Sequence, residues 1–441
     1  MTDAADRPET SPAQMRKVVA ASMIGSTIEW YDFFLYGTAA ALVFNKLFFP
    51  AADPLVGTML AFASYAVGFF ARPLGGVIFG HYGDRIGRKK LLMLSLVLMG
   101  AATVLIGLLP TYQQIGLWAP ALLVLLRIVQ GFAVGGEWGG AVLIVAEHGD
   151  AARRGFWTSW PQAGVAAGSL LASGVLALMA GLQNEADFLA WGWRVPFVLS
   201  VVLIGVGYWI RATVEESPTF KAAVSEQAEL PKAPVMDAIR EYPRNLLVAG
   251  GLKFAENISY YVVSVFSITY VTQALGLPRQ TALNAILIAS AVHVVLIPLF
   301  GALSDRIGRK PVYAFGAFGM LAWAFALFPL LDTRDPVLIT VGCLGVMLFH
   351  AAMYGPQAAF MAEMFPTRMR YSAISLAQQV TSMFAGSLAP LIAAALLAAT
   401  GSGAAVGWYI AGAALLTGVS TLFARETKGR TFAEIDAEGR G

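Results

Sequence analysis

The most constraining feature of this 441-residue sequence is a series of twelve apolar stretches, most of them about 20 residues long. A helix of that length crosses the hydrocarbon core of a bilayer, and lipid admits only helices or closed barrels as spanning structures. Runs of this length exclude the shorter alternating strands of a barrel. Hydrophobic residues make up 57% of the chain, charged residues only 13%, and the mean hydropathy is +0.66. We therefore expect an all-α membrane protein with twelve transmembrane helices.

The apolar stretches are interrupted by one longer hydrophilic segment, which carries charges of both signs and several prolines. The expected spans are 17–44, 55–80, 91–110, 117–147, 155–181, 195–211, 245–273, 281–303, 311–331, 336–362, 372–399 and 405–424. We expect two pseudo-symmetric six-helix bundles, divided as follows: N-tail 1–16, first bundle 17–211, cytoplasmic linker 212–244, second bundle 245–424 and C-tail 425–441.

A ten-residue charged motif occurs twice, at residues 80–89 and 301–310, and both copies fit G-x-x-x-D-R-x-G-R-K. Each copy lies between the second and third span of its half. Further positions recur in the same order: Glu147 as Glu363, Arg154 as Arg370 and Gln162 as Gln378. This duplication indicates a transporter whose two halves rock against each other.

The motif places an acid at the inner end of a helix, with basic residues directly after it. Such a cluster can bond to the neighbouring bundle and to helix ends, holding the cytoplasmic side shut in one state. The alternative is a positively charged membrane anchor without a gating role. The candidate gating residues are Gly80, Asp84, Arg85, Gly87, Arg88, Gly301, Asp305, Arg306, Gly308, Arg309, Glu147, Arg154, Glu363 and Arg370.

The basic residues are unevenly distributed between alternate loops. Few of the 30 Lys and Arg residues fall in the external loops, namely Lys46, Arg194, Arg279 and Arg334. The positive-inside rule then places both termini in the cytoplasm. The net charge of +3 reflects this topology, so we expect no nucleic-acid partner.

The rest of the composition limits location and chemistry. The residues before the first span lack an apolar core, so we expect no cleavable signal peptide. The single cysteine, Cys343, lies in an apolar stretch and offers neither a disulfide nor a thiol metal site. We expect a monomeric, multi-pass protein of the bacterial cytoplasmic (inner) membrane, with no metal and no cofactor.

Several segments resemble a known family. The motif pair and the twelve-span layout resemble the major facilitator superfamily. Residues 28–37 (IEWYDFFLYG), 72–76 (RPLGG), 127–140 (RIVQGFAVGGEWGG) and 191–197 (WGWRVPF) are similar to its metabolite:proton symporter family. The resemblance covers nearly the whole chain and implies secondary transport by alternating access. It also implies a role in binding and proton coupling for Arg127 on the fourth span.

Seven ionisable residues fall within the expected spans: Arg72, Arg127, Lys253, Glu29, Asp32, Glu137 and Glu256. A charge at bilayer depth costs about 2.5–3.5 kcal/mol on insertion scales, so such groups face a cavity or each other. We therefore expect side chains from both halves to converge on one cavity.

On the fourth span, Arg127 and Glu137 lie on one helix face. The planar guanidinium fork matches a carboxylate, so Arg127 is our first candidate for binding an anionic substrate or a proton-carrying acid. A structural ion pair is the alternative. On the first span, a carboxyl in apolar surroundings can load and release a proton near neutral pH. Asp32 is the preferred carrier, with Glu29 and Glu137 as rivals.

On the seventh span, Lys253, Glu256 and Tyr260 lie one helical turn apart, and Asn257 flanks them. The lysine and glutamate can simply neutralise each other, or a substrate can displace Glu256 from Lys253. The further candidates for substrate contact are Tyr36, Trp160, Gln162, Gln378 and Arg72, and Arg72 could equally stabilise a kink at Pro73. His293 and His350 are interpreted as packing residues.

The chain contains neither a phosphate-binding loop nor H-E-x-x-H, so nucleotide-driven transport and intramembrane enzyme chemistry have no support. The leading hypothesis is proton-coupled uptake of a small organic anion, such as an aromatic or hydroxylated carboxylate, a keto acid or a dicarboxylate. The alternative is uptake of a zwitterionic osmolyte such as proline or betaine, because the resembled family includes such carriers and aromatic rings can hold a quaternary amine. A nutrient sensor that binds without transporting is a third class.

Overall fold

The computed structural model describes residues 12–51, 53–86, 88–135, 137–213 and 234–438, and these residues form helices without a single strand. The all-α prediction is therefore confirmed. The first half contains α1 (Pro12–Ala39), η1 (Ala40–Phe44), α2 (Asn45–Leu47), α3 (Pro54–Ile86), α4 (Arg88–Leu108), α5 (Tyr112–Ile115), α6 (Trp118–Val134), α7 (Glu137–His148), η2 (Ala151–Arg153), α8 (Arg154–Leu182), α9 (Glu185–Asp187), η3 (Phe188–Gly192) and α10 (Arg194–Thr213).

The second half begins with α12 (Pro234–Glu241), a short helix that packs on α18. It continues with α13 (Pro243–Tyr261), η4 (Val262–Phe266), α14 (Ser267–Thr269), η5 (Tyr270–Ala274), α15 (Arg279–Ile307), α16 (Arg309–Asp332), α17 (Pro336–Ala362), α18 (Thr367–Thr381), η6 (Ser382–Gly386), α19 (Ala389–Thr400), α20 (Gly403–Phe423) and α21 (Phe432–Glu438). Each of the twelve expected spans coincides with one helix or with a series of consecutive elements, and residues 387–388 form a turn between η6 and α19.

By length and hydropathy alone, 7 of the described helices qualify as membrane spans, or 8 when the bent pair formed by residues 185–192 and 194–209 is counted as one. The helices α1 and α13, which carry most of the intramembrane charges, are not among the seven. Short π-helical segments interrupt α1, α13 and α18, and such π-turns often occur where a helix contributes to a functional site.

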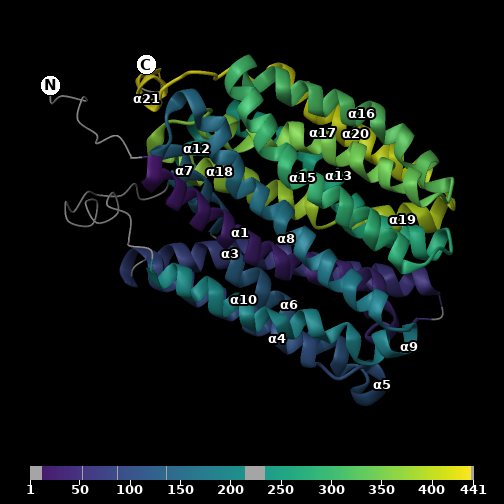
Figure 1. Ribbon diagram of the computed structural model, residues 1–441. Helices are drawn as coiled ribbons and strands as arrows, with labels where there is room; N and C mark the ends of the chain where they lie inside the picture. Colours follow the sequence, from purple (N-terminus) through teal and green to yellow (C-terminus); the bar gives the residue numbers. More distant parts are fainter. Residues whose placement is uncertain (1–11, 52, 87, 136, 214–233, 439–441) are drawn as a thin grey trace.

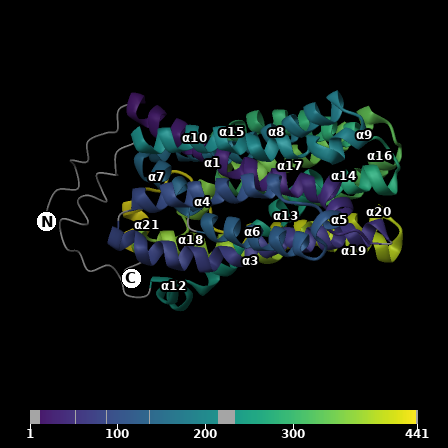
Figure 2. The same ribbon diagram turned by 90° about the horizontal axis from the view of Figure 1, so that it is seen from below.

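The helices of each half pack mainly on one another, and the two halves meet along two seams. Figure 1 shows the first half, from purple to teal, beside the green and yellow second half, and Figure 2 shows the helices of both halves running along one common direction. Along one seam α8 packs against α15 and α17, and along the other α3 packs against α19. Glycines allow the closest approach: a Cβ atom on Gly301 would lie 2.7 Å from the carbonyl oxygen of Gly155. Small residues at such crossings let membrane helices pack backbone to backbone.

Candidate functional site

A small cavity lies between the two halves, deep inside the helix bundle. Its lining residues come from α1, α8, α13, α17 and α18: Trp30, Phe34, Val165, Glu256, Asn257, Tyr260, Tyr261, His350, Tyr354 and Gln378. The volume open to the centre of a water molecule is about 20 Å³, which is room for roughly one water. The substrate candidates Glu256, Asn257, Tyr260 and Gln378 are thus brought together at this cavity.

The main polar cluster at the cavity belongs to the second half. Lys253 Nζ lies 2.6 Å from Glu256 Oε1 and donates a 3.0 Å hydrogen bond to Gln357 Oε1. The Gln357 amide in turn donates to Glu256 Oε1 and to the Tyr313 hydroxyl. Asn257 donates a further 2.9 Å bond to the same carboxylate oxygen. A buried ion pair is stable only when additional hydrogen bonds offset the loss of hydration of its two charges. Gln357 and Asn257 supply such bonds to the Lys253–Glu256 pair.

Two histidines extend this cluster. His350 Nε2 lies 3.7 Å from Glu256 Oε2, and His350 Nδ1 shares a 2.9 Å hydrogen bond with His293 Nε2. The ring of Tyr260 packs 4.7 Å from the His350 ring, measured between centroids. The sequence analysis expects each histidine to be a hydrogen-bonded packing residue, and the structure adds that the two are each other's partner, because helices far apart in sequence bring them together.

A second polar cluster surrounds Arg127 in the first half. Its guanidinium donates to the Tyr65 carbonyl at 3.3 Å and to Gln130 Oε1 at 3.1 Å. The same guanidinium lies 4.4 Å above the Phe33 ring and 4.5 Å above the Tyr36 ring. Within the described part of the chain Arg127 makes no ion pair. Its charged guanidinium is therefore stabilised by cation–π contacts and by hydrogen bonds to neutral acceptors.

Asp32 lies close to this second cluster and forms no ion pair with any residue that the structure describes. Its carboxylate accepts a 2.7 Å hydrogen bond from the Ser200 hydroxyl of α10. Gln130 donates a 2.7 Å bond to Thr103 Oγ1, and the Thr103 hydroxyl also neighbours the Asp32 carboxylate. Gln130 and Thr103 thus connect Arg127 with Asp32. Through these two residues, protonation of Asp32 can affect Arg127.

The expectation that Arg127, Asp32 and Lys253 meet in one cavity does not hold in this conformation. Aromatic rings fill the space between the two clusters. Phe33 packs on Tyr65 at 5.0 Å and on Tyr261 at 6.3 Å between ring centroids, and Tyr261 also lines the cavity. The halves present their charges to the two sides of this aromatic wall.

The other candidates on the first half lie around the same wall. Arg72 is buried with its guanidinium 4.5 Å from the Phe33 ring and 4.4 Å from the Phe69 ring, and its charge acts on Glu29. Tyr36 bonds the Ser64 hydroxyl at 2.8 Å. Gln162 on α8 is fully buried.

Trp160 lies outside the cavity. It packs beside the buried cluster of Met15, Val19 and Val145, at the end of the bundle where α1 begins. Glu137, Gly80, Asp84, Arg85, Gly87 and Arg88 have side chains or backbone outside the described part of the structure, so their predicted roles stay predictions.

The second copy of the charged motif lies at the contact between the halves. Asp305 accepts hydrogen bonds from the backbone N–H groups of Gly155 at 2.9 Å and Phe156 at 2.8 Å, at the start of α8 in the other half. Arg309 binds both Asp305 and Glu363. These bonds join the start of α8 to the end of α15.

Glu363 extends the same network across the halves. It accepts a 2.9 Å bond from Arg154 of the first half and a 3.1 Å bond from Arg309 of the second. Thr427 of the C-terminal segment donates a 2.6 Å bond to its other oxygen. Hydrogen bonds between charged groups are about twice as strong as those between neutral groups, and here they hold the two halves together at one end of the bundle.

The C-terminal segment covers this network. The Phe432 ring lies between two guanidinium groups, 3.9 Å from Arg154 and 3.6 Å from Arg370. Glu426 accepts from the backbone N–H groups of Arg309 and Lys310, next to Gly308, whose φ of 112° favours glycine. Of the remaining motif residues, Arg306 and Glu147 are exposed.

The opposite end of the bundle is closed as well. Gln273 of the second half donates a 2.9 Å bond to Thr58 of the first, and Arg279 donates to the carbonyls of Ala180 and Gln183 at the end of α8. Beside these contacts lies an outer pocket with a volume of about 210 Å³. The halves thus touch on both sides of the central cavity, as in an occluded state.

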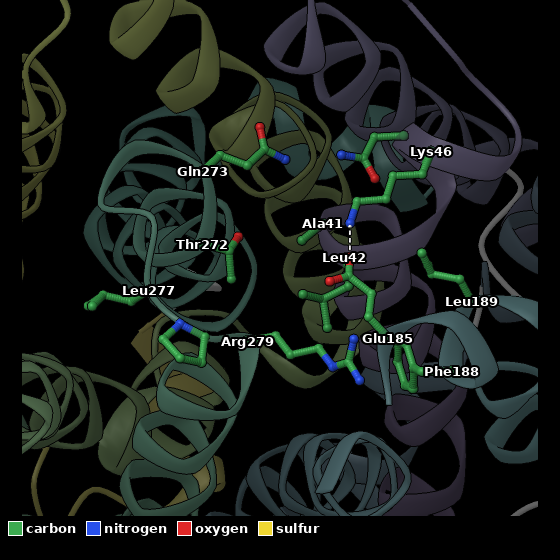
Figure 3. Close-up of a pocket in the computed structure, with 12 residues that line it drawn as sticks. Ala41, Leu42, Lys46, Glu185, Phe188, Leu189, Thr272, Gln273, Leu277 and Arg279 are labelled. Atoms are coloured by element: carbon green, nitrogen blue, oxygen red, sulfur yellow. Dashed lines mark hydrogen bonds and ion pairs between the residues drawn. The ribbon is translucent and has the colours of Figure 1, made fainter. Parts of the chain in front are cut away.

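Figure 3 shows this outer pocket, with Lys46 reaching across to Glu185. The two side chains form an exposed 2.7 Å ion pair. The hydrogen bond and the charge of Lys46 lower the pKa of Glu185 below its usual value. On the other wall, Arg279 lies 4.3 Å from the Phe188 ring.

Comparisons with known proteins agree with this architecture. The chain matches the model of the Major Facilitator Superfamily over residues 22–390 and 251–439. It is 40% identical to the shikimate transporter of Escherichia coli K12, over 96% of this chain and 97% of that protein. It is 36% identical to the proline/betaine transporter of the same organism, over 96% of this chain and 87% of that protein.

Among solved structures, a D-xylose–proton symporter superposes with a TM-score of 0.74 at 22% identity, over 94% of this chain and 99% of the other. The XylE proton:xylose symporter bound to 6-bromo-6-deoxy-D-glucose gives a TM-score of 0.76 at 20% identity, over 97% and 99%. At these identities the likeness establishes the fold alone. Together with the family match and the sequence relatives, it shows a multi-pass secondary transporter rather than an enzyme, and the chain therefore belongs to the major facilitator superfamily.

Proposed function

We propose that the protein takes up a small organic anion together with protons, by alternating access across a bacterial cytoplasmic membrane. The observation that carries the proposal is the buried Lys253–Glu256 pair, whose acid lines a cavity closed at both ends. A lysine at bilayer depth is costly, so it is retained where its charge is used. A substrate carboxylate can take the place of Glu256 on Lys253, provided that Glu256 gives up its charge by binding a proton.

The first half supplies the other parts of the proposed cycle. Arg127 carries a full charge without an acidic partner among the described residues, and Asp32 is a buried carboxyl connected to it through Gln130 and Thr103. In an open state, rotation of the aromatic wall would expose Arg127 to the same cavity. Asp32 remains the preferred proton carrier of this half, with Glu29 and Glu137 as rivals.

The relatives support a substrate with a carboxylate. One of them is named a shikimate transporter, and shikimate is a hydroxylated carboxylate. We therefore favour aromatic or hydroxylated carboxylates, with keto acids and dicarboxylates as further members of the class. We also propose that both termini lie in the cytoplasm and that a single copy suffices, because one chain encloses the whole cavity.

Reconstituted transport tests this proposal. Proteoliposomes with an imposed proton gradient should accumulate labelled shikimate, and an uncoupler should abolish the accumulation. Lys253→Gln removes a charged hydrogen-bond donor worth about 1.5–3 kcal/mol, so the apparent affinity should fall about 10- to 100-fold. Lys17→Gln, which removes an exposed lysine near the start of α1, is the matched control and should leave the affinity unchanged. Uptake that ignores the proton gradient contradicts the proposal.

Uptake of a zwitterionic osmolyte is the second candidate. Trp30, Phe34 and Tyr260 supply aromatic faces beside the Glu256 carboxylate, and that combination suits a quaternary amine. Relatives named for proline and betaine transport match 96% of this chain over 87% of their own length. Competition of glycine betaine and proline against labelled shikimate separates the two candidates. Ligand binding without counterflow exchange would instead indicate a sensor.

A further inference from the structure

Four ionisable side chains form a continuous buried chain through the second half. Lys253 and Glu256 come from α13, His350 from α17 and His293 from α15, and each is at most 4% exposed. The successive contacts are 2.6 Å from Lys253 to Glu256, 3.7 Å from Glu256 to His350 and 2.9 Å between the two imidazoles. Packing alone requires neither this order nor this proximity of groups that can gain and lose protons.

The geometry fixes how protons can be arranged along the chain. When His350 Nε2 carries a proton facing Glu256, His350 Nδ1 must accept, and the proton of the shared bond then sits on His293 Nε2. His293 Nδ1 is left as a lone pair. Within the described residues this nitrogen is buried and has no hydrogen-bond partner. The chain thus has an open, proton-accepting end at His293 and an acidic end at Glu256.

The two ends lie in different parts of the molecule. Glu256 and His350 line the central cavity, whereas His293 belongs to α15, the helix that packs along α8 of the other half. Ser290, one turn earlier on α15, also has a buried hydroxyl without a partner in the described residues. The chain therefore links the cavity with a helix of the seam between the halves.

The surroundings of the imidazoles hold few other ionisable groups. From α13 come Lys253, Glu256, Tyr260 and Tyr261, from α16 comes Tyr313, and from α17 comes Tyr354. The sequence of α8 has no ionisable residue after Arg154, and α1 presents Trp30 and Phe34 to the cavity while Asp32 bonds Ser200. Among the described neighbours, Glu256 favours a protonated imidazole and Lys253 opposes it.

We propose that Glu256, His350 and His293 form a second proton-binding site, located in the C-terminal half, whose protonation frees Lys253 for the substrate carboxylate. A proton from hydronium binds His293 Nδ1, the Nε2 proton of His293 passes to His350 Nδ1, and the Nε2 proton of His350 passes to Glu256 Oε2. One proton enters and one is delivered, and only N–H and O–H bonds change. The 3.7 Å contact must shorten to a hydrogen-bond distance of about 3 Å for the last transfer.

The consequence is a direct exchange of partners at Lys253. Once Glu256 is neutral it no longer attracts the ammonium group, while Gln357 continues to accept from Lys253 at 3.0 Å. A substrate carboxylate then becomes the favourable partner. This inference rests on the proposed function in one respect, namely that the substrate is an anion. The proton site itself does not depend on that identity.

A spectroscopic titration without substrate tests the proton site. The full chain in lipid nanodiscs is titrated while infrared difference spectra record the carbonyl band of protonated carboxyl groups. Comparison with Glu256→Gln isolates the Glu256 contribution from those of Asp32 and Glu29. His350→Gln and His293→Gln should each move the pH of that contribution by about one unit or more, which is a tenfold change in proton affinity. Met347→Leu, a buried change one turn from His350, should not move it.

Transport by the same variants separates this inference from the proposed function. With shikimate as the probe, both histidine variants should lose about tenfold or more of the proton-driven accumulation, whereas Met347→Leu should retain it within about twofold. An unmoved Glu256 titration in both histidine variants overturns the second proton site, even if wild-type uptake is proton-driven. Failure of the wild type to carry shikimate, with the titration shifted as expected, overturns the anion assignment and leaves the proton site standing. If His350→Gln does not fold, His293→Gln, which lies farther from Glu256, decides the matter.

Discussion

Asp305 offers the sharpest test of closure at the end of the bundle that we propose to be cytoplasmic, because it bonds the opposite half through two backbone groups. Its carboxylate accepts from the N–H groups of Gly155 and Phe156 at 2.9 and 2.8 Å, at the positive end of α8. Asp305→Asn keeps one acceptor oxygen and turns an amide N–H₂ toward a backbone N–H. The side chain is only 7% exposed, so solvent offers little replacement.

The magnitude follows from these contacts. A hydrogen bond to a charged group contributes about 1.5–3 kcal/mol, and a charge at a helix N-terminus about 0.3–1 kcal/mol. We take about 2 kcal/mol as the net loss, since the remaining oxygen keeps one bond. The ratio of cytoplasmic-closed to cytoplasmic-open molecules should then fall about 30-fold.

Spin-label distances measure this ratio. With Cys343 replaced by serine, labels at Ala152→Cys and Ile307→Cys report the separation of α8 and α15 at the cytoplasmic end, where both native side chains are exposed. Asp305→Asn should shift the distribution toward longer distances. Asp335→Asn is the matched control, because Asp335 also accepts from two backbone N–H groups but within its own helix. An unchanged distribution in Asp305→Asn, or an equal shift in the control, would refute the reasoning.

Three further predictions concern the same contacts and the outer surface. Gly301→Val places side-chain atoms against the α8 backbone, where even a Cβ would lie 2.7 Å from a carbonyl oxygen, so thermal stability should fall by about 1–3 kcal/mol. Phe432→Ala removes a ring 3.9 Å from the Arg154 guanidinium, and the same spin-label pair should report more cytoplasmic opening, by about 1 kcal/mol. Glu185→Gln removes the exposed pair with Lys46. Because the pKa of Glu185 is lowered in the folded protein, its small contribution, below about 1 kcal/mol, is present above the usual glutamate pKa and is lost as pH falls through the lowered value. Melting curves of wild type and variant should differ near neutral pH and converge on acidification; a difference that persists in acid contradicts this assignment.

Much of the fold could be predicted because its signal is local. Runs of about 20 apolar residues can only be helices in lipid, and the two copies of the charged motif divide the chain into matching halves. The pairing of Lys253 with Glu256 also follows from spacing, since residues three apart share a helix face. Likewise, the recurrence of charged residues pointed to Asp305 and Glu363, which lie together at the cytoplasmic contact.

The histidine chain could not be found in the same way. His293 and His350 are on different helices, and no local pattern states which faces of two distant helices meet. One signal was present on α17, where His350, Tyr354 and Gln357 follow a four-then-three spacing that defines a single polar face in an apolar helix. That face is the one that turns to Lys253 and Glu256.

The separation of Arg127 from Lys253 could not be predicted from the sequence either. Helix-face arguments place each charge on an inward side, but whether aromatic rings stand between them depends on the conformation of the whole transporter. In the closed state Phe33 and Tyr261 occupy that space. A sequence describes all states of a transport cycle at once, whereas this structure shows one of them.

The central claim is that substrate and proton meet at Lys253 and Glu256. Its most direct test is proton uptake on ligand binding, recorded with a pH indicator as shikimate is added to purified protein in weakly buffered solution. The account predicts net proton uptake by the wild type and its loss in Glu256→Gln with binding retained. Saturable binding with no proton uptake by the wild type at any pH would contradict it.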